Sequence, residues 1–177
     1  MRLSLLLLPA LMLSGTAQAR DTKAWGRVSD VGRDVLVAVA LGLPITQGDG
    51  KSALESAGSI GAAFLVTEGL KETFPERRPD GSDRKSFPSG HTSVAFAAAA
   101  SLQNRDGWRV GLPAQAVAAL VGFSRVEARK HHWYDVVTGA AIGEASGFLI
   151  TSRRDDRVKV MPWGDTSGGG VSMGVRF

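Results

Sequence analysis

The chain has 177 residues, of which 44% are hydrophobic and 21% charged, and it contains no cysteine. This balance is typical of a single globular domain, and it excludes disordered, fibrous and disulfide-framed classes as well as cysteine nucleophiles and thiolate metal sites. The formal net charge of +4 favours anionic ligands or surfaces, but no lysine- and arginine-rich run or zinc-finger spacing indicates a nucleic-acid partner.

The N-terminal residues have the organisation of a targeting signal. Arg2 provides a positive start, Leu3 to Leu13 is almost entirely apolar, and Ala17-Gln18-Ala19 matches a cleavage site. We predict a signal peptide over residues 1–19. The alternative is an uncleaved membrane anchor, for which the apolar run is short, because a span needs about 20 residues. An exported protein without cysteine fits the bacterial periplasm better than an extracellular eukaryotic setting.

Residues 20–152 are predicted to form a helical domain. Five segments are candidate helices, namely residues 34–43, 52–74, 91–102, 113–129 and 132–151. Pro44 should end or kink the first, and Pro113 suits the first turn of the fourth. Ser52 and Glu55 have the spacing of a capping box at the start of the second. Because small residues dominate these segments and let helices approach closely, we predict an all-α fold, a compact bundle of about five helices.

Residues 153–177 differ in character from the helical segments. Residues 157–161 and 171–177 alternate between apolar and polar or glycine positions, and the glycine-rich segment 164–170 joins them. This pattern predicts a C-terminal β-hairpin. A tail without regular structure is the alternative.

Membrane association is a separate question from export. The longest uncharged run after the predicted signal peptide, residues 86–104, contains several polar side chains, and Glu55, Glu68 and Glu144 interrupt other segments. None of these segments is a continuous apolar run of the length that a transmembrane helix needs. We therefore predict a globular body in the periplasm. Binding to a membrane stays open, because a helical bundle can bury polar residues inside and face lipid outside.

The residues with the most distinctive chemistry lie in three short segments. In the third of them, His131 and Asp135 are four positions apart, which places them on one face of a helix. A carboxylate there would fix the tautomer of the imidazole and leave its other nitrogen free to attack. Arg125 could offer a planar fork to an oxyanion. The alternative is a solvent-exposed His–Asp pair.

The other two segments offer groups that bind anions. Ser89, Gly90 and His91 stand at the start of the predicted third helix, where backbone N–H groups bind anions and glycine permits close approach. His91 could donate a proton to a leaving oxygen. Lys71 and Arg78 could hold phosphate oxygens. A simple helix cap and a solvent-exposed basic turn are the alternatives.

Together the segments read Lys-x6-Arg-Pro, Pro-Ser-Gly-His and Ser-Arg-x5-His-x3-Asp, in this order. This arrangement closely resembles the signature of the type 2 phosphatidic acid phosphatase superfamily, which includes class A acid phosphatases and vanadium haloperoxidases. The match runs from Lys71 to Asp135 and fills every signature position. One departure is the connection between Pro79 and Pro88, which is short for the family and would leave a shallow or open site.

The resemblance implies a metal-free phosphohydrolase without a cofactor, built on an α-helical bundle. It implies His131 as the nucleophile that forms a phosphohistidine, Asp135 as its orienting carboxylate, and His91 as the group that protonates the leaving group and then activates water. The phosphoryl oxygens would be held by Lys71, Arg78 and Arg125, with help from Ser89 and Gly90. Cations and backbone N–H groups supply the positioning and charge neutralisation that phosphoryl transfer needs.

We therefore predict an exported phosphatase that hydrolyses phosphomonoesters or lipid (pyro)phosphates. A vanadate-dependent haloperoxidase, a transferase that moves phosphate between lipid carriers, and a non-catalytic phosphate-binding module are the alternatives. Phe74, Phe87 and Trp133 flank the three segments, and they would either line an apolar entrance for a lipid substrate or belong to the core. The choice between soluble and lipid substrates and the oligomeric state stay open.

Overall fold

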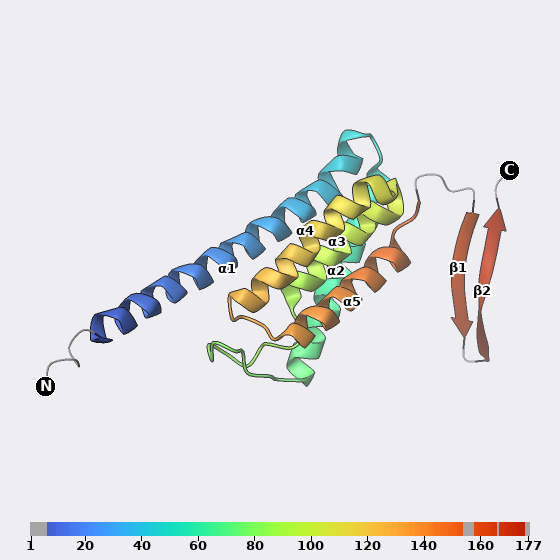
Figure 1. Ribbon diagram of the computed structural model, residues 1–177. Helices are drawn as coiled ribbons and strands as arrows, with labels where there is room; N and C mark the ends of the chain where they lie inside the picture. Colours follow the sequence, from blue (N-terminus) through green and yellow to red (C-terminus); the bar gives the residue numbers. More distant parts are fainter. Residues whose placement is uncertain (1–6, 154–157, 166, 176–177) are drawn as a thin grey trace, which may run out of the picture.

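The computed structural model describes residues 7–153, 158–165 and 167–175 (Figure 1). In chain order the elements are α1 (Leu7–Thr46), α2 (Gly50–Thr73), α3 (Gly90–Asp106), α4 (Trp108–Glu127), α5 (Trp133–Ile150), β1 (Val158–Asp165) and β2 (Gly168–Val175). The prediction of an all-α bundle of about five helices is confirmed.

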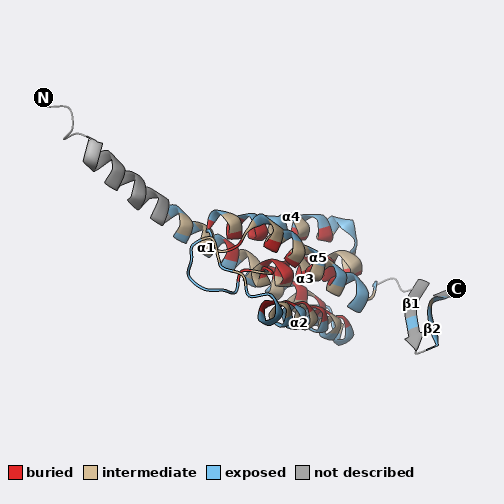
Figure 2. Cartoon of the chain, turned by 90° about the horizontal axis from the view of Figure 1, so that it is seen from below, coloured by how far each residue is buried: buried red, intermediate tan, exposed pale blue. Residues whose placement is uncertain are grey.

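Helix α3 lies at the centre of the bundle and contacts the four other helices, which surround it in the order α1, α4, α5, α2 (Figure 2). Its alanines make this position possible, since Ala95 and the run 97–100 are completely buried. Because α3 is central, its first residues lie where the ends of the surrounding helices and two connecting segments meet.

Small side chains form the core, and many large apolar side chains lie outside it. Along α2 the buried positions are Ser52, Ser56, Ser59, Ala63, Thr67 and Lys71, which repeat with helical spacing. The neighbouring Phe64, Leu65 and Val66 are exposed, at 50%, 70% and 48%. The bundle is therefore packed through small residues, as the sequence predicts, and it presents an apolar outer surface.

The closest approach that the glycines reveal is between α5 and α3. A Cβ atom on Gly139 would lie 2.6 Å from the backbone oxygen of Ser89, and one on Gly143 would lie 2.4 Å from that of Ser93. The same glycine stripe continues to Gly147. The two backbones are therefore in contact, which holds the first turn of α5 against the start of α3.

Gly143→Ala is expected to destabilise the fold by about 1–3 kcal/mol, because an added methyl group must push the two backbones apart. Gly61→Ala is the matched control, since nothing lies within 4 Å of a Cβ at that position of α2. Alanine there should leave stability unchanged or raise it by up to about 1 kcal/mol. Thermal unfolding followed by circular dichroism measures both, and equal midpoints for the two variants would contradict this packing.

Two prolines lie inside helices. Helix α1 continues through Pro44 and ends two residues later, close to where the sequence predicts its end. Helix α4 begins at Trp108, so Pro113 lies inside it and not in its first turn as predicted. Gly107, with φ +79°, separates α3 from α4. The glycine and not the proline therefore sets the start of α4, because it adopts the left-handed conformation that the turn requires.

The predicted capping box at the start of α2 is wrong. Asp49 is the N-cap: its carboxylate accepts hydrogen bonds from the Ser52 N–H at 3.0 Å and the Ser52 hydroxyl at 2.6 Å. Glu55 instead accepts a hydrogen bond from the backbone N–H of Ser152 at 2.8 Å. The helix begins earlier than predicted because Asp49 offers a capping oxygen one turn before Ser52.

The C-terminal strands pair as an antiparallel hairpin, which confirms the hairpin prediction over the alternative of a tail. The register runs from Val158 opposite Val175 to Asp165 opposite Gly168, so part of the predicted glycine-rich connection belongs to the strands. A Cβ on Gly170 would lie 3.0 Å from the indole of Trp163. Glycine therefore leaves room for that ring on the neighbouring strand.

Helix α1 contains most of the predicted signal peptide and the predicted cleavage site. Helix α1 is continuous across Ala19, where we predict cleavage of a signal peptide. Residues 1–6 of that predicted peptide lie outside the described residues. Among the described residues, no helix has both the length and the apolar composition that a membrane crossing requires.

Candidate active site

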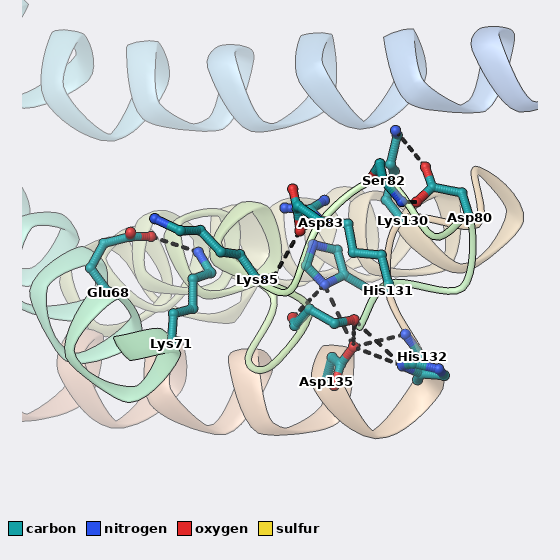
Figure 3. Close-up of polar contacts among 12 residues, drawn as sticks. Glu68, Lys71, Asp80, Ser82, Asp83, Lys85, Lys130, His131, His132 and Asp135 are labelled. Atoms are coloured by element: carbon teal, nitrogen blue, oxygen red, sulfur yellow. Dashed lines mark hydrogen bonds and ion pairs between the residues drawn. The ribbon is translucent and has the colours of Figure 1, made fainter. Parts of the chain in front are cut away.

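The three signature segments meet at one end of the bundle, where they enclose a cavity of about 250 Å³. Figure 3 shows part of this region, with Lys71 and His131 labelled. The cavity is lined by Lys71, Arg78, Gly90, His91, Arg125 and His131, all predicted site residues, and by Arg33, Phe64, Glu68 and Val94. Six of the eight predicted residues therefore converge around one hollow, although they come from α2, α3, α4 and two connecting segments.

His131 lies in the connection before α5 and not on the helix, so the prediction that it shares a helical face with Asp135 is wrong. Its side chain is 2% exposed, and its Nδ1 lies 2.7 Å from the backbone oxygen of Ser86. In the neutral ring Nδ1–H donates to that carbonyl, which leaves a lone pair on Nε2. Burial lowers the pKa of His131, against the opposing effect of Asp135, so the ring is neutral at neutral pH.

Asp135 lies in the first turn of α5 and is completely buried. Its Oδ2 accepts hydrogen bonds from the Ser86 hydroxyl at 2.6 Å and the His132 N–H at 2.8 Å, and lies 3.6 Å from Nδ1 of His131. Burial raises the pKa of Asp135, but the nearby His131 ring and the hydrogen bonds from Ser86 and the His132 N–H outweigh it, and the net shift is downward. A fixed negative charge therefore lies beside His131, where it can stabilise a positive imidazole.

His91 is the second residue of α3, and its partners come from α1. Its Nε2 lies 2.7 Å from Nη1 of Arg33 and 2.7 Å from Oδ1 of Asp30. Burial, Arg125 and Arg33 lower the pKa of His91 to about 4, while Asp30 raises it. Sequence reasoning missed both α1 residues, because charged side chains on a helix usually mark a solvent-exposed face.

Two cations of the cavity are held by carboxylates. Nζ of Lys71 lies 2.6 Å from Oε1 of Glu68, one turn earlier on α2 (Figure 3). Nε of Arg78 donates to Oδ1 of Asp83 at 2.7 Å. Lys71 is only 9% exposed, so its ammonium group is largely withdrawn from water. These contacts orient both cations and leave further donors for an anion.

Arg125 is the least compensated cation of the site. It is 7% exposed, its Nη1 donates to the Ser29 hydroxyl at 3.2 Å, and its Nε has no partner among the described residues. Burial, reinforced by the neighbouring charge of Arg78, lowers the pKa of Arg125 to about 10. The cavity therefore carries an unfavourable excess of positive charge, which a bound anion would relieve.

Gly90 and Ser89 occupy different places at the start of α3. A Cβ on Gly90 would lie 3.0 Å from Nζ of Lys71, so glycine lets the lysine reach the cavity. The Ser89 hydroxyl instead accepts a hydrogen bond from Thr92, and its backbone N–H donates to the backbone oxygen of Asp135. Ser89 is not among the residues lining the cavity, and its contacts tie α3 to α5.

The short connection between α2 and α3 is tied to the connection between α4 and α5. The backbone N–H of Asp80 donates to the backbone oxygen of Arg129 at 3.0 Å. Nζ of Lys130 lies 2.6 Å from the Asp80 carboxylate (Figure 3). These contacts join the segment that carries Arg78 to the segment that carries His131.

A second cluster of titratable groups lies beside His131. Glu76, His132 and Asp135 place possible ligand atoms within 4.8 Å of one another. Oε1 of Glu76 already accepts a hydrogen bond from the Tyr134 hydroxyl, and Oδ2 of Asp135 accepts from Ser86 and the His132 N–H, while Oδ1 of Asp135 has no partner among the described residues. A metal ion bound to the engaged oxygens would have to displace these donors, so we interpret the cluster as a hydrogen-bond network in which the Ser86 hydroxyl and the backbone N–H of His132 orient Asp135.

The three aromatic residues that flank the signature are not core residues. Phe74 and Phe87 pack edge to face with ring centres 6.2 Å apart, and both line an open groove with Leu70 and Tyr134. Trp133 is 69% exposed and does not line the groove. Phe74 and Phe87 thus form an apolar surface beside the cavity-forming segments, while Trp133 faces solvent.

Comparison with known proteins supports the resemblance seen in the sequence. The model of the PAP2 superfamily matches residues 52–159. A lipid A 1-phosphatase of Porphyromonas gingivalis is 31% identical over 147 residues, 81% of this chain and 27% of the relative. A lipid A 4'-phosphatase of Helicobacter pylori is 34% identical over 111 residues, 54% of this chain and 56% of the relative. The chain therefore spans between about a quarter and about half of these relatives.

Solved structures show the same fold. The crystal structure of Aquifex aeolicus LpxE aligns with a TM-score of 0.63 at 22% identity, over 72% of this chain and 83% of that one. The transmembrane PAP2 type phosphatidylglycerolphosphate phosphatase of Bacillus subtilis aligns with a TM-score of 0.57 at 26% identity, over 73% and 74%. With the family model matching more than half of its length, this chain belongs to the PAP2 superfamily.

Proposed function

We propose that this protein is a metal-independent phosphatase that hydrolyses lipid phosphates through a phosphohistidine on His131. The observation that supports this most directly is the environment of His131. Its Nδ1 proton is held by the Ser86 carbonyl at 2.7 Å, and the ring lines a cavity whose other walls carry cations. A neutral imidazole with a free lone pair beside an anion-binding hollow is a suitable nucleophile for phosphorus.

The first half-reaction transfers the phosphoryl group to the protein. The Nε2 lone pair of His131 attacks phosphorus while the bond from phosphorus to the leaving oxygen breaks. His91 gives its proton to that oxygen, so the product leaves as a neutral alcohol. Asp135 stabilises the positive charge that develops on the His131 ring, and Lys71 and Arg125 neutralise the phosphoryl oxygens.

The second half-reaction releases phosphate. A water molecule attacks the phosphorus of the phosphohistidine, and His91, now neutral, accepts one proton from that water. The bond between Nε2 of His131 and phosphorus breaks, and its electron pair returns to the nitrogen. Inorganic phosphate leaves, and His91 is again protonated for the next turnover.

Lipid substrates are supported by the apolar character of the molecule around the site. Phe64 and Val94 line the cavity beside its charges, and large apolar residues are exposed on α1, α2, α4 and α5. Exposed apolar surface on this scale marks interaction with a membrane or another protein. We propose that the exported protein works at a membrane surface of the cell envelope, in line with the lipid A phosphatases that it resembles.

A substrate panel tests this assignment. We expect kcat/KM for phosphatidate or lipid A presented in mixed micelles to exceed that for nucleotides and sugar phosphates by at least about tenfold. In envelope fractions the protein should sediment with membranes. Equal rates on soluble and lipid esters, or a protein wholly in the soluble periplasmic fraction, would contradict the lipid assignment.

The pKa of His91, which burial and the neighbouring cations lower to about 4, predicts a pH dependence. Because His91 must be protonated to assist the leaving group, kcat/KM should fall as the pH rises above mildly acidic values. A bound phosphate ester favours the charged imidazole, so the fall in kcat should lie at higher pH. Both parameters can be measured between about pH 4 and pH 9, and a kcat/KM that rises throughout would contradict the role of His91.

A further inference from the structure

We propose that Asp30 and Arg33 of α1 are positioning residues of the active site, which hold His91 and set when it carries a proton. This inference rests on the proposed phosphatase function. It concerns residues outside both the signature, which starts at Lys71, and the family-model match, which starts at residue 52.

Three side chains of helix α1 contact residues that line the cavity. Asp30 and Arg33 are three positions apart, so they share one face of the helix, and both reach Nε2 of His91 at 2.7 Å. On the same helix, Ser29 accepts a hydrogen bond from Arg125. Leu36 anchors this part of α1 in the core. The helix is therefore part of the wall of the site.

The two partners correspond to the two protonation states that the mechanism requires. A protonated Nε2 donates to the Asp30 carboxylate. A neutral ring with its proton on Nδ1 instead accepts at Nε2 from the Arg33 guanidinium. The same nitrogen cannot do both at once, so Asp30 favours the acid form of His91 and Arg33 favours the base form.

Most charged groups around His91 are cations, so the Asp30 carboxylate matters for keeping His91 protonated. The charged and titratable groups that face His91 are Asp30 and Arg33 from α1, Glu68 and Lys71 from α2, Arg78 from the connection after α2, Arg125 from α4, and His131 from the connection before α5. Cations predominate, and Glu68 is engaged by Lys71. Among the described residues, Asp30 is the carboxylate within hydrogen-bond distance of His91.

The test is a pair of substitutions with opposite expected effects. Asp30→Asn removes the group that favours the proton, so the alkaline limb of the kcat profile should move to lower pH by about one unit. Arg33→Gln removes a repelling cation, so the same limb should move to higher pH. A merely structural role for these residues would not move the limb in opposite directions.

The leaving group supplies a second readout. With an alkyl phosphate, whose leaving oxygen needs a proton, Asp30→Asn should lose at least about tenfold in kcat at neutral pH. With p-nitrophenyl phosphate, whose phenolate leaves without a proton, the loss should be small. Asp30→Glu and Arg33→Lys, which keep the charges, should restore most of the wild-type pH profile.

Asp21→Asn and Arg27→Gln are the matched controls, because both residues are exposed on α1 and neither lines the cavity. They should leave the pH profile unchanged. The chain has three histidines, so NMR titration of their imidazoles gives a readout that does not depend on turnover, with the His91 midpoint falling in Asp30→Asn and rising in Arg33→Gln.

The inference would be overturned by unmoved limbs and midpoints, by shifts in the same direction, or by equal losses with both leaving groups. A wild-type protein that hydrolyses no phosphate ester would instead refute the proposed function. The NMR titration would then still decide whether Asp30 and Arg33 control the protonation of His91.

Discussion

His131→Ala is expected to lower kcat for phosphate-ester hydrolysis by at least about 10⁴-fold, because removal of one member of a nucleophile–base–carboxylate set costs about 10⁴–10⁶-fold. The substitution deletes the attacking Nε2 but leaves the cations of the cavity in place, so substrate should still bind. Single-turnover kinetics with a saturating lipid phosphate measures the chemical step directly.

His132→Ala is the matched control for this result. His132 adjoins His131 in the sequence but does not line the cavity, and its imidazole stacks on Tyr134. The backbone N–H of His132, which orients Asp135, is kept in the variant. We expect a loss below about tenfold. If His132→Ala were the inactive variant and His131→Ala the active one, the assignment of the nucleophile would be wrong.

Arg125→Met is expected to lower kcat/KM by about 10²–10³-fold, the range for removal of one charge-stabilising group. The same substitution should not lower the stability of the fold. Burial and Arg78 lower the pKa of Arg125, so the folded protein disfavours the charged side chain, and methionine keeps an apolar chain there. The midpoint of thermal unfolding should therefore be unchanged or higher.

Phosphate binding separates this account from general damage to the fold. Inorganic phosphate should raise the unfolding midpoint of the wild type, because it binds the folded state, and this shift should be lost in Arg125→Met. Arg109→Met is the control, since Arg109 is exposed on the same helix beside Trp108. A variant at Arg125 that keeps full activity, or that loses activity only by unfolding, would contradict the proposed role.

The fold class could be predicted because small residues recur throughout the helical segments. Small side chains permit close helix packing whichever helix lies opposite, so they predict a tightly packed bundle even when the partner helices are unknown. The contact between Gly143 and the backbone of α3 is an example. The convergence of the site residues could be predicted only through the spacing of the signature, because no local pattern shows that the ends of α2 and α4 lie near the start of α3.

The position of His131 could not be predicted from its spacing to Asp135. Helix α4 ends in a turn in which Arg129 has φ +56°, and the N–H groups of Lys130 and His131 both donate to the backbone oxygen of Arg125. Such left-handed ends usually show a glycine, and here there is none. The predicted helices already stop at residue 129 and resume at 132, but the four-residue spacing of His131 and Asp135 suggested one helical face where the chain in fact turns to bring His131 against Ser86.

The roles of α1 were also beyond sequence reasoning. Asp30 and His91 are 61 positions apart, and a carboxylate on a helix with exposed neighbours is most often in solvent. Only the packing of α1 against α3 and α4 brings Ser29, Asp30 and Arg33 to the cavity. A contact between residues so far apart in the chain produces no pattern that can be recognised in a single sequence.

The most direct test of the central claim is to trap the covalent intermediate. Rapid quenching in base during turnover of a ³²P-labelled lipid phosphate, followed by peptide mapping, should find acid-labile label on the peptide that contains His131, and none in His131→Ala. Label on a different residue, or full wild-type turnover with no labelled protein at any quench time, would contradict a phosphohistidine at His131.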